Sequence, residues 1–319
     1  ISLQSPSGIR RLALVLYLAS VAALVAVLFW GVEINGARRW IRIAGVSVQP
    51  AEIAKPAFVV LAAWAFAEWQ RRRDMPALPV AIAVFTVFAL LTVLQPDLGQ
   101  TVLIAMVWGT LFVLAGLSLV WVGVLAGLAL AGFGVAYLSL PYVRDRISQF
   151  IDPVLDARSQ VGQAYQSFVS GGFFGRGPGE GSIKTTLPDA HNDFIFAVIA
   201  EEYGVAACLA LLALFAVIVF RALARAVLEP DLANRYAVCG LALLIGYQAL
   251  INMAVNVGLL PAKGMTLPMV SAGGSSIIGV SITLGMLLAI SRRRPGAASR
   301  AFAPAGASHR NSPEVGYRN

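Results

Sequence analysis

The sequence predicts an all-α protein, a polytopic bundle of transmembrane helices, from two observations. Hydrophobic residues make up 58% of the 319 residues and charged residues only 13%, and the mean hydropathy is +0.77. A soluble domain of this size and composition would expose far too much apolar surface. The apolar residues also form runs about as long as a bilayer is thick. We therefore expect about eight spans and a long extracytoplasmic loop in a single domain, residues 1–291, followed by a disordered cytoplasmic tail, residues 292–319.

The first predicted span is Leu12–Trp30, an uncharged apolar run. A polar loop, Val32–Gln49, leads directly into the next helix. The uncharged core of that helix, Pro56–Ala67, is too short to cross a bilayer alone, so Glu52 and Lys55 must be drawn toward the membrane. Because they are spaced i,i+3, their side chains can pair on one face of the helix.

The third predicted span is Ala77–Leu94, and it ends in a tight turn, Gln95–Gln100, that holds one carboxylate, Asp97. The following segment, Thr101–Val143, carries no charge and is too long for a single helix. The small residues Gly116-Leu117-Ser118 predict a turn between two spans within it.

A long hydrophilic loop, Arg144–His191, separates these five spans from the rest of the chain. It contains a glycine-rich run, Gly171–Gly181, which we expect to be flexible. The run lacks the spacing of a P-loop, so its sequence gives little support for phosphate binding of that kind.

Three further spans are predicted at Phe194–Phe220, Tyr236–Leu260 and Met265–Ile290. The outer half of the last one is interrupted by Pro268 and by the small-residue segment Ser271–Ser276. Such a break is tolerated in a membrane only where the freed backbone groups face protein or water.

Basic residues fall in alternate gaps between the predicted spans, which places them on one side of the membrane. These clusters are Arg10/Arg11, Arg71–Arg73, Arg221/Arg225 and Arg292–Arg294. By the positive-inside rule that side is the cytoplasm. The loops at 32–49, 95–100, 144–191 and 261–266 then face outward together. The net charge of +8 therefore reflects topology, and we set nucleic-acid binding aside. The two cysteines, Cys208 and Cys239, lie in apolar segments and are expected to act as small packing residues.

Asp193 is the most informative residue, because it lies where the polar loop becomes an apolar helix. An ionisable group at such a depth is costly unless it has a function. Asp189 or Asn192 could cap the helix, which would place Asp193 in the first turn, where the macrodipole favours an anion. The alternative is that Asp193 is itself only a helix-capping carboxylate.

Arginines on the outer face, Arg38, Arg39 and Arg42, break the positive-inside rule, and Lys263 lies on the same side. They are either a solvated surface or the surroundings of an anionic ligand such as a diphosphate.

Several segments together resemble the signature sequences of the SEDS family, the FtsW and RodA proteins. They are Gly36–Trp40, Gln49–Glu52, Gln95–Gly99, Leu187–Ala197, Pro261–Gly264 and Ser271–Ser276. The resemblance covers the chain from Arg10 to Ile290 and is greater to the division members than to the elongation members. The family has ten membrane helices, so the resemblance predicts that two more helices precede Ile1. Ala272 departs from the family pattern, which usually has an aromatic residue there.

The resemblance implies a peptidoglycan glycosyltransferase that polymerises lipid II on the outer face of the bacterial cytoplasmic membrane at the division septum, together with a class B penicillin-binding protein and other division proteins. It marks Asp193 as the catalytic position, a base that deprotonates the acceptor hydroxyl. The candidates for the diphosphate site are Arg39, Lys55 and Lys263, then Arg38 and Arg42, with Glu52 and Asp97 completing the substrate site. No cofactor is implied, although a divalent cation could assist the diphosphate.

Two points stay open at the level of sequence. A carboxylate in the first turn of a helix should be a poor base, so burial or a neighbour such as Asp189 would have to offset the dipole. His191 is either a capping or packing residue or a partner in proton transfer.

Other functions are also compatible with the sequence. A lipid flippase or secondary transporter would use the intramembrane charges Glu52, Lys55, Asp97, Glu201 and Glu202 and the interrupted helix as a path. A membrane scaffold for division partners would leave Asp193 and the outward cations without a purpose.

Overall fold

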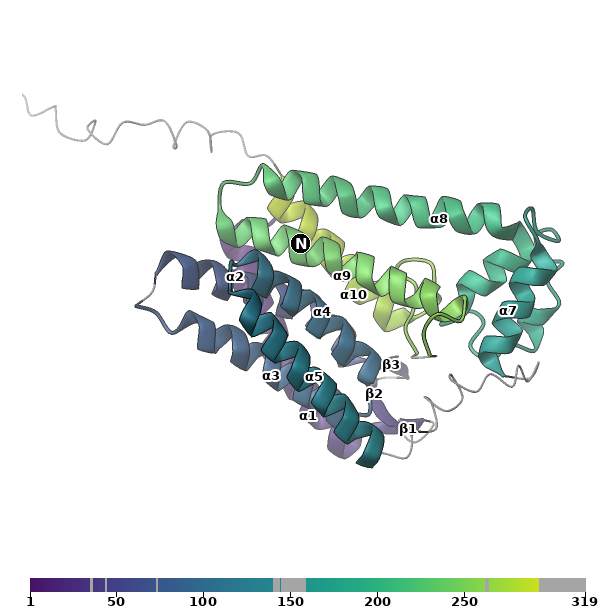
Figure 1. Cartoon of the computed structure of the whole chain (residues 1–319), viewed down its shortest axis with the longest axis horizontal. Coiled ribbons are helices and arrows are strands. Elements are labelled where there is room, and N and C mark those ends of the chain that lie inside the picture. The colour runs from purple at the N-terminus through teal and green to yellow at the C-terminus, as the bar shows by residue number, and fades with distance from the viewer. Residues whose placement is uncertain are drawn as a thin grey trace, which may run out of the picture.

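A computed structural model of the chain describes residues 1–34, 37–43, 45–72, 74–139, 144, 159–261 and 264–292. Figure 1 shows a bundle of long helices with smaller elements gathered toward one end. The long helices are α1 (Pro6–Trp30), α2 (Pro50–Arg71), α3 (Ala77–Leu94), α4 (Leu98–Leu114), α5 (Leu119–Ser139), α8 (Ile195–Val227), α9 (Leu232–Asn256) and α10 (Gly274–Ser291). In the described part of the chain, six of them are long and apolar enough to cross a membrane: α1, α2, α3, α8, α9 and α10. The prediction of a polytopic helical bundle is confirmed.

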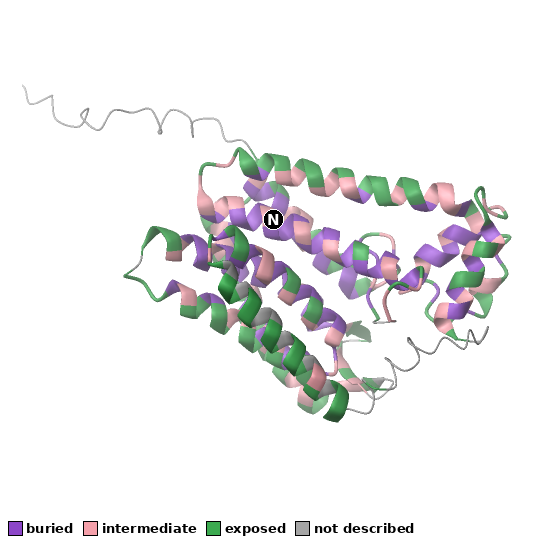
Figure 2. Cartoon of the chain, in the orientation of Figure 1, coloured by how far each residue is buried: buried purple, intermediate pink, exposed green. Residues whose placement is uncertain are grey.

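Helices α2 and α9 form the centre of the bundle. Helix α2 contacts α1, α3, α4, α9 and α10, and nearly all of its residues from Pro50 to Ala67 are buried. By contrast, α1 and α8 expose large apolar side chains such as Leu18, Phe29, Leu209 and Phe220, and Figure 2 shows the exposed residues along α8 and α5. Such apolar outer faces suit a lipid environment.

The predicted turn between α4 and α5 is present, because α4 ends at Leu114 and α5 begins at Leu119. Gly116 provides the turn with a φ of +73°, a conformation that favours glycine. The uncharged segment is therefore divided where the small residues indicated.

The basic clusters meet at one end of the bundle. The Arg71 guanidinium donates a hydrogen bond of 2.6 Å to Asp231 at the start of α9. Arg225 and Arg292 line one small cavity there. Of the predicted clusters, Arg73, Arg293 and Arg294 lie outside the described residues, as does the rest of the predicted tail.

The predicted polar loop at Val32–Gln49 is instead a small antiparallel sheet. Strands β1 (Val32–Ile34), β2 (Ala37–Ile43) and β3 (Val46–Val48) are arranged in the order β1-β2-β3. Val32 is paired with Trp40, and Ile41 with Val48. The sheet is followed directly by α2. This helix begins at Pro50, and proline is favoured in the first turn of a helix.

The described part of the long loop contains helix α7 (Gln160–Gly171) and a short 3₁₀ helix, η1 (Ile183–Thr185). The glycine-rich run, Gly171–Gly181, was expected to be flexible, but it is folded against α8. The backbone N–H of Arg176 donates to the carbonyl of Glu201 at 2.9 Å. A Cβ on Gly175 would lie only 2.2 Å from the carbonyl oxygen of Glu202, so only glycine allows this approach.

Helix α8 consists of two helical parts joined by a kink at Gly204, where φ is +79°. Just after the kink, the N–H of Val205 donates to the carbonyl of Gly172 at 3.0 Å. A Cβ on Gly204 would lie 2.3 Å from the Phe173 carbonyl oxygen. The kink therefore opens the helix backbone to the glycine-rich run.

Candidate active site

Asp193 lies in a turn just before α8, which begins at Ile195 with Phe194 as its N-cap. The N–H groups of Asn192 and Asp193 each donate to the Asp189 carbonyl at 3.0 Å, and Asp189 has a φ of +54°. The expectation that Asp193 occupies the first helical turn, with Asp189 or Asn192 as the cap, is therefore wrong. The chain uses backbone hydrogen bonds to close a turn there in place of a side-chain cap.

Two buried asparagines of α9 hold the backbone of Asp193. The Nδ2 atoms of Asn252 and Asn256 each donate to the Asp193 carbonyl at 2.9 Å. Asn256 also accepts a hydrogen bond of 3.0 Å from the N–H of Ala197 in the first turn of α8. These residues were missed from the sequence, although two asparagines spaced i,i+4 in an apolar helix are a signal that could have found them.

The interrupted segment before α10 supports the same turn from another side. The hydroxyl of Ser271 donates to the Asn192 carbonyl at 2.5 Å and accepts from the N–H of Leu267 at 2.7 Å. The N–H of Ala272 donates to the His191 carbonyl at 2.9 Å. The predicted break in the last helix is confirmed, and the freed N–H groups of Leu267 and Ala272 are satisfied within the protein. The His191 side chain is exposed.

A cavity of about 380 Å³ brings together residues that are far apart in the sequence. It lies between the sheet, the start of α2, the Asp193 turn and the segment before α10. A Cβ placed on Gly264 would lie 3.5 Å from Asp193 Oδ2 and 3.9 Å from Arg39 Nη1. The carboxylate and the guanidinium therefore approach the same side of Gly264. Residues that line the cavity include Arg39, Trp40, Gln49, Glu52, Asp189, Asp193 and Thr266.

Arg39 is oriented by the turn between α3 and α4. Its Nε donates to the Gln95 carbonyl at 3.3 Å, and its Nη2 donates to the Pro96 carbonyl. Its Nη1 is 3.9 Å from Asp97 Oδ1. These contacts fix the plane of the guanidinium while its Nη1 remains close to the cavity.

Asp97 is buried behind Arg39 and acts as the N-cap of α4, where it accepts from the Gln100 N–H at 3.4 Å. It also accepts from Gln49 Nε2 at 3.1 Å. Burial raises the pKa of Asp97, although the positive charge of Arg39 acts in the opposite direction. Asp97 therefore supports Arg39 from behind and is not among the residues that line the cavity.

The pKa of Asp193 is raised to about 6, first by burial and then by the negative charge of Asp189, while Arg39 opposes the shift. In the described part of the chain, no group donates a hydrogen bond to its carboxylate. Both offsetting influences expected from the sequence, burial and Asp189, are thus present. A carboxyl with this pKa is ionised at neutral pH and is more basic than an ordinary aspartate.

Glu52 and Lys55 form the ion pair predicted from their spacing. Lys55 Nζ lies 2.8 Å from Glu52 Oε2, and the two side chains are only 3% and 4% exposed. Lys55 also donates to Gln248 Oε1 at 2.8 Å, and Gln100 Nε2 donates to Glu52 Oε1 at 2.6 Å. The pair therefore joins α2, α4 and α9. Glu52 borders the cavity, whereas Lys55, a predicted member of the diphosphate site, lies inside the bundle and is not among the residues that line the cavity.

The remaining predicted cations are placed differently. Arg38 is exposed and donates to Glu33 of β1 at 3.2 Å, and Arg42 is exposed on β2. Neither is among the residues that line the cavity. Lys263 lies outside the described residues, next to Gly264 in the chain. Among the described residues, no group of three His, Cys, Asp or Glu side chains is placed to hold a metal ion.

The two glutamates inside α8 have structural partners. Glu201 is fully buried and accepts from the N–H groups of Ser182 at 2.8 Å and Ile183 at 3.1 Å. Glu202 pairs with Lys184. Their charges thus hold the loop between α7 and α8 against the N-terminal part of α8.

The sequence matches the family of cell cycle proteins that comprises FtsW, RodA and SpoVE over residues 1–295. The probable peptidoglycan glycosyltransferase FtsW of Caulobacter vibrioides is 44% identical over 296 residues, which cover 93% of this chain and 76% of that protein. The FtsW of Halomonas elongata, described in the same words, is 38% identical over 286 residues, covering 86% of this chain and 72% of that protein.

Solved structures give the same assignment. A chain of a peptidoglycan synthase complex that coordinates polymerization and crosslinking has a TM-score of 0.73 at 32% identity, covering 91% of this chain and 83% of that chain. The rod shape determining protein RodA of Thermus thermophilus has a TM-score of 0.63 at 29% identity, covering 91% and 81%. The resemblance drawn from the sequence segments is confirmed, and the chain belongs to the FtsW, RodA and SpoVE family of cell cycle proteins.

Proposed function

We propose that this chain is a peptidoglycan glycosyltransferase that polymerises lipid II, with Asp193 as the general base. The observation that carries the proposal is the placement of Asp193 and Arg39 at one cavity, on the same side of Gly264. An anionic base and a cation at the same cavity suit a reaction in which a hydroxyl loses a proton while an anionic group leaves. The names of the curated relatives state the same activity.

In the proposed reaction, an acceptor sugar hydroxyl attacks the anomeric carbon of the donor. The new bond between that carbon and the hydroxyl oxygen forms as the bond to the lipid diphosphate breaks. The proton of the hydroxyl passes to the Asp193 carboxylate, whose pKa of about 6 makes it a suitable acceptor near neutral pH. The asparagines of α9 fix the Asp193 backbone, so the carboxylate needs little reorganisation to reach the hydroxyl.

The leaving diphosphate takes up negative charge, and Arg39 is placed to neutralise it. Two backbone carbonyls already orient the guanidinium, and such preorganised cations stabilise charge that develops in a transition state. A planar guanidinium also suits bidentate contact with phosphate oxygens. Lys263, the neighbour of Gly264 in the chain, is proposed as the second cation at this site.

We place the reaction on the outer face of the bacterial cytoplasmic membrane, during division. The basic clusters lie at one end of the bundle, and the positive-inside rule makes that end cytoplasmic. The cavity residues lie at the other end of the bundle, in loops and at the helix ends next to them. A class B penicillin-binding protein is the proposed partner. In support of a partner, one structural relative is a chain of a complex that coordinates polymerization with crosslinking.

The test is polymerisation of labelled lipid II by purified full-length protein in detergent, where a flippase leaves no product. Asp193→Asn keeps the shape of the side chain but removes the base, so we expect a loss of at least about 100-fold in rate. Asp74→Asn, the same change at an exposed site near the end of α2, is the matched control and should leave the rate unchanged. An Asp193→Asn rate above roughly a tenth of the wild-type rate contradicts the assignment.

A further inference from the structure

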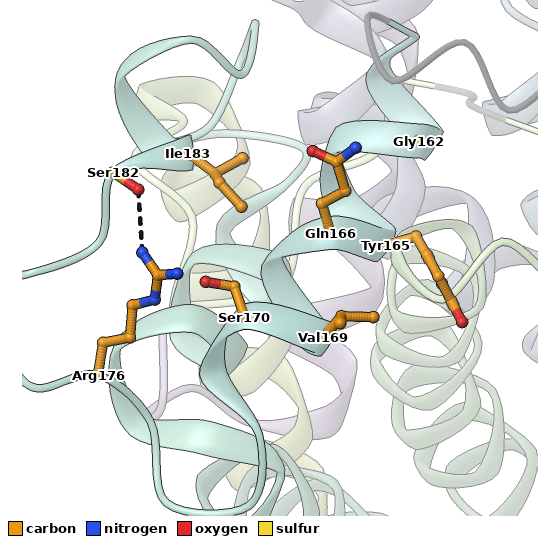
Figure 3. Close-up of a pocket in the computed structure, with 8 residues that line it drawn as sticks. All are labelled: Gly162, Tyr165, Gln166, Val169, Ser170, Arg176, Ser182 and Ile183. Atoms are coloured by element: carbon orange, nitrogen blue, oxygen red, sulfur yellow. Dashed lines mark hydrogen bonds between the residues drawn. The ribbon is translucent and has the colours of Figure 1, made fainter.

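A second cavity lies outside the proposed catalytic site, between α7 and the glycine-rich run. Its volume is about 550 Å³. Figure 3 shows Arg176 and Ser182 on one side of it and the side chains of α7 on the other. The lining residues used below are Tyr165, Gln166, Val169, Ser170, Arg176 and Ser182. Nothing in the mechanism above uses them.

One face of α7 lines this cavity. Tyr165, Gln166, Val169 and Ser170 are spaced so that they form a continuous stripe along the helix. Ala164, on another face, is buried, and α7 packs against α8. Tyr165 and Val169 are 55% and 66% exposed, so α7 presents an aromatic and an aliphatic group to this space. Exposed aromatic residues next to polar groups are typical of binding sites.

The opposite wall is polar. Arg176 Nη1 donates to Ser182 Oγ at 3.2 Å and lies 4.0 Å from Glu201 Oε1, and the Arg176 side chain is 47% exposed. Ser170 Oγ is buried and has no hydrogen-bond partner among the described residues. The cavity thus offers an arginine, the Ser182 hydroxyl and the Gln166 amide as hydrogen-bonding groups.

This chemistry fits a saccharide better than a phosphate. Among the described residues that line the cavity, the one cation, Arg176, is already close to the Glu201 carboxylate, so its charge is partly balanced. The other polar groups are neutral donors and acceptors, which match sugar hydroxyls and N-acetyl groups. The Tyr165 ring and Val169 can cover the apolar face of a sugar ring.

Helix α7 also connects the two cavities. Gln160, its first residue, lines the Asp193 cavity, whereas Gly162 lines the second. Two residues correspond to about 3 Å along a helix axis and to a rotation of about 200°, so the two cavities lie on opposite faces of the first turn of α7. A chain of sugars extending from the Asp193 cavity would pass around the first turn of α7 to reach the stripe from Gly162 to Ser170.

We propose that the α7 cavity is a saccharide subsite that binds the glycan strand beyond the sugars that react at Asp193. The proposal rests on the proposed function, because the strand is the product of that reaction. It assigns to Tyr165, Gln166 and Arg176 the retention of the strand between successive additions. Strand length, and not the chemistry of one coupling, then depends on these residues.

The first test is binding of chitotetraose, a soluble β-1,4-linked N-acetylglucosamine tetramer, to the purified full-length protein. We expect saturation-transfer NMR signals for the wild type. One lost hydrogen bond changes affinity about fivefold, so Gln166→Ala should weaken binding by about that factor, and Tyr165→Ala combined with Gln166→Ala by about 10- to 30-fold. Glu180→Gln, on an exposed residue of the same loop that does not line the cavity, is the control and should bind like the wild type.

The second test is the length of the glycan made from lipid II. The double variant should make strands several-fold shorter, while its rate of coupling two lipid II molecules stays within about twofold of the wild-type rate. Arg176→Gln, which keeps a hydrogen-bonding side chain at this position, gives an independent second variant in case the double variant does not fold.

The outcomes separate the two proposals. Wild-type polymer with no chitotetraose binding and unchanged strand length overturns the subsite and leaves the proposed function intact. Chitotetraose binding that is lost in the α7 variants, by a protein that makes no polymer, supports a saccharide site and contradicts the proposed function. If glycerol phosphate binds the wild type and not the α7 variants, while chitotetraose binds neither, the cavity is a lipid headgroup site and the proposal is overturned.

Discussion

The buried pair of Glu52 and Lys55 gives the sharpest test of how this bundle is stabilised. We consider Lys55→Met, which keeps the length of the side chain and removes its charge. In the structure, Lys55 contacts Glu52 and Gln248 within the bundle and is not among the residues that line the cavity at Asp193. The substitution should therefore act on stability, and it should not act on substrate binding directly.

The expected magnitude follows from the burial of the pair. Both side chains are at most 4% exposed, so Lys55→Met leaves a buried carboxylate with Gln100 as its remaining donor. Removing one partner of a buried ion pair costs about 3–5 kcal/mol. Glu52 borders the cavity and can gain some hydration there, so we expect the lower end, about 3 kcal/mol. For a chain of this size that corresponds to a fall in Tm of roughly 4–5 °C.

The assay is thermal unfolding of the purified protein in one detergent at fixed concentration. Combining Glu52→Gln with Lys55→Met removes both charges and should recover most of the lost stability, because no uncompensated charge remains. Arg38→Met, which breaks an exposed ion pair with Glu33, is the matched control and should cost less than about 1 kcal/mol. An unchanged Tm for Lys55→Met together with a loss of lipid II binding would refute this reasoning and return Lys55 to the substrate site.

Three further predictions concern the Asp193 site and the contact between α8 and the glycine-rich run, Gly171–Gly181. Burial raises the pKa of Asp193 to about 6, and the base must be ionised, so the logarithm of kcat/KM should fall with unit slope below about pH 6 and be level above it. An unchanged kcat/KM at pH 5 would exclude Asp193 as the base. Asn256→Ala removes a hydrogen bond to the Asp193 carbonyl, so turnover should fall more than lipid II affinity; the reverse pattern would assign Asn256 to binding alone. Gly204→Ala should lower Tm by several degrees, because a Cβ would lie 2.3 Å from the Phe173 carbonyl oxygen. The control Ala206→Gly, close by in α8, should lower Tm less, and equal effects would show that the kink is not the cause.

The sequence by itself determined the helical framework. The third span was predicted at Ala77–Leu94, which is where α3 lies, and the turn near Gly116 was placed correctly. A membrane makes this possible, since only long apolar segments with internally bonded backbones can cross it, and such segments are visible locally in the sequence. The ion pair of Glu52 and Lys55 was equally predictable, because its i,i+3 spacing lies within one helix.

Only the tertiary structure decided what surrounds the predicted site residues. The sheet at residues 32–48 was not predicted, because its strands are very short and become visible only through their pairing. The hydrogen bonds from Asn252 and Asn256 to the Asp193 carbonyl join residues about sixty positions apart, and no local periodicity of the sequence predicts them. Arg39 lies at the cavity with Asp193 whereas Lys55 lies inside the bundle, although the sequence made both of them candidates for the diphosphate site. Burial and neighbouring charge separate these cases, and both depend on which helices pack together.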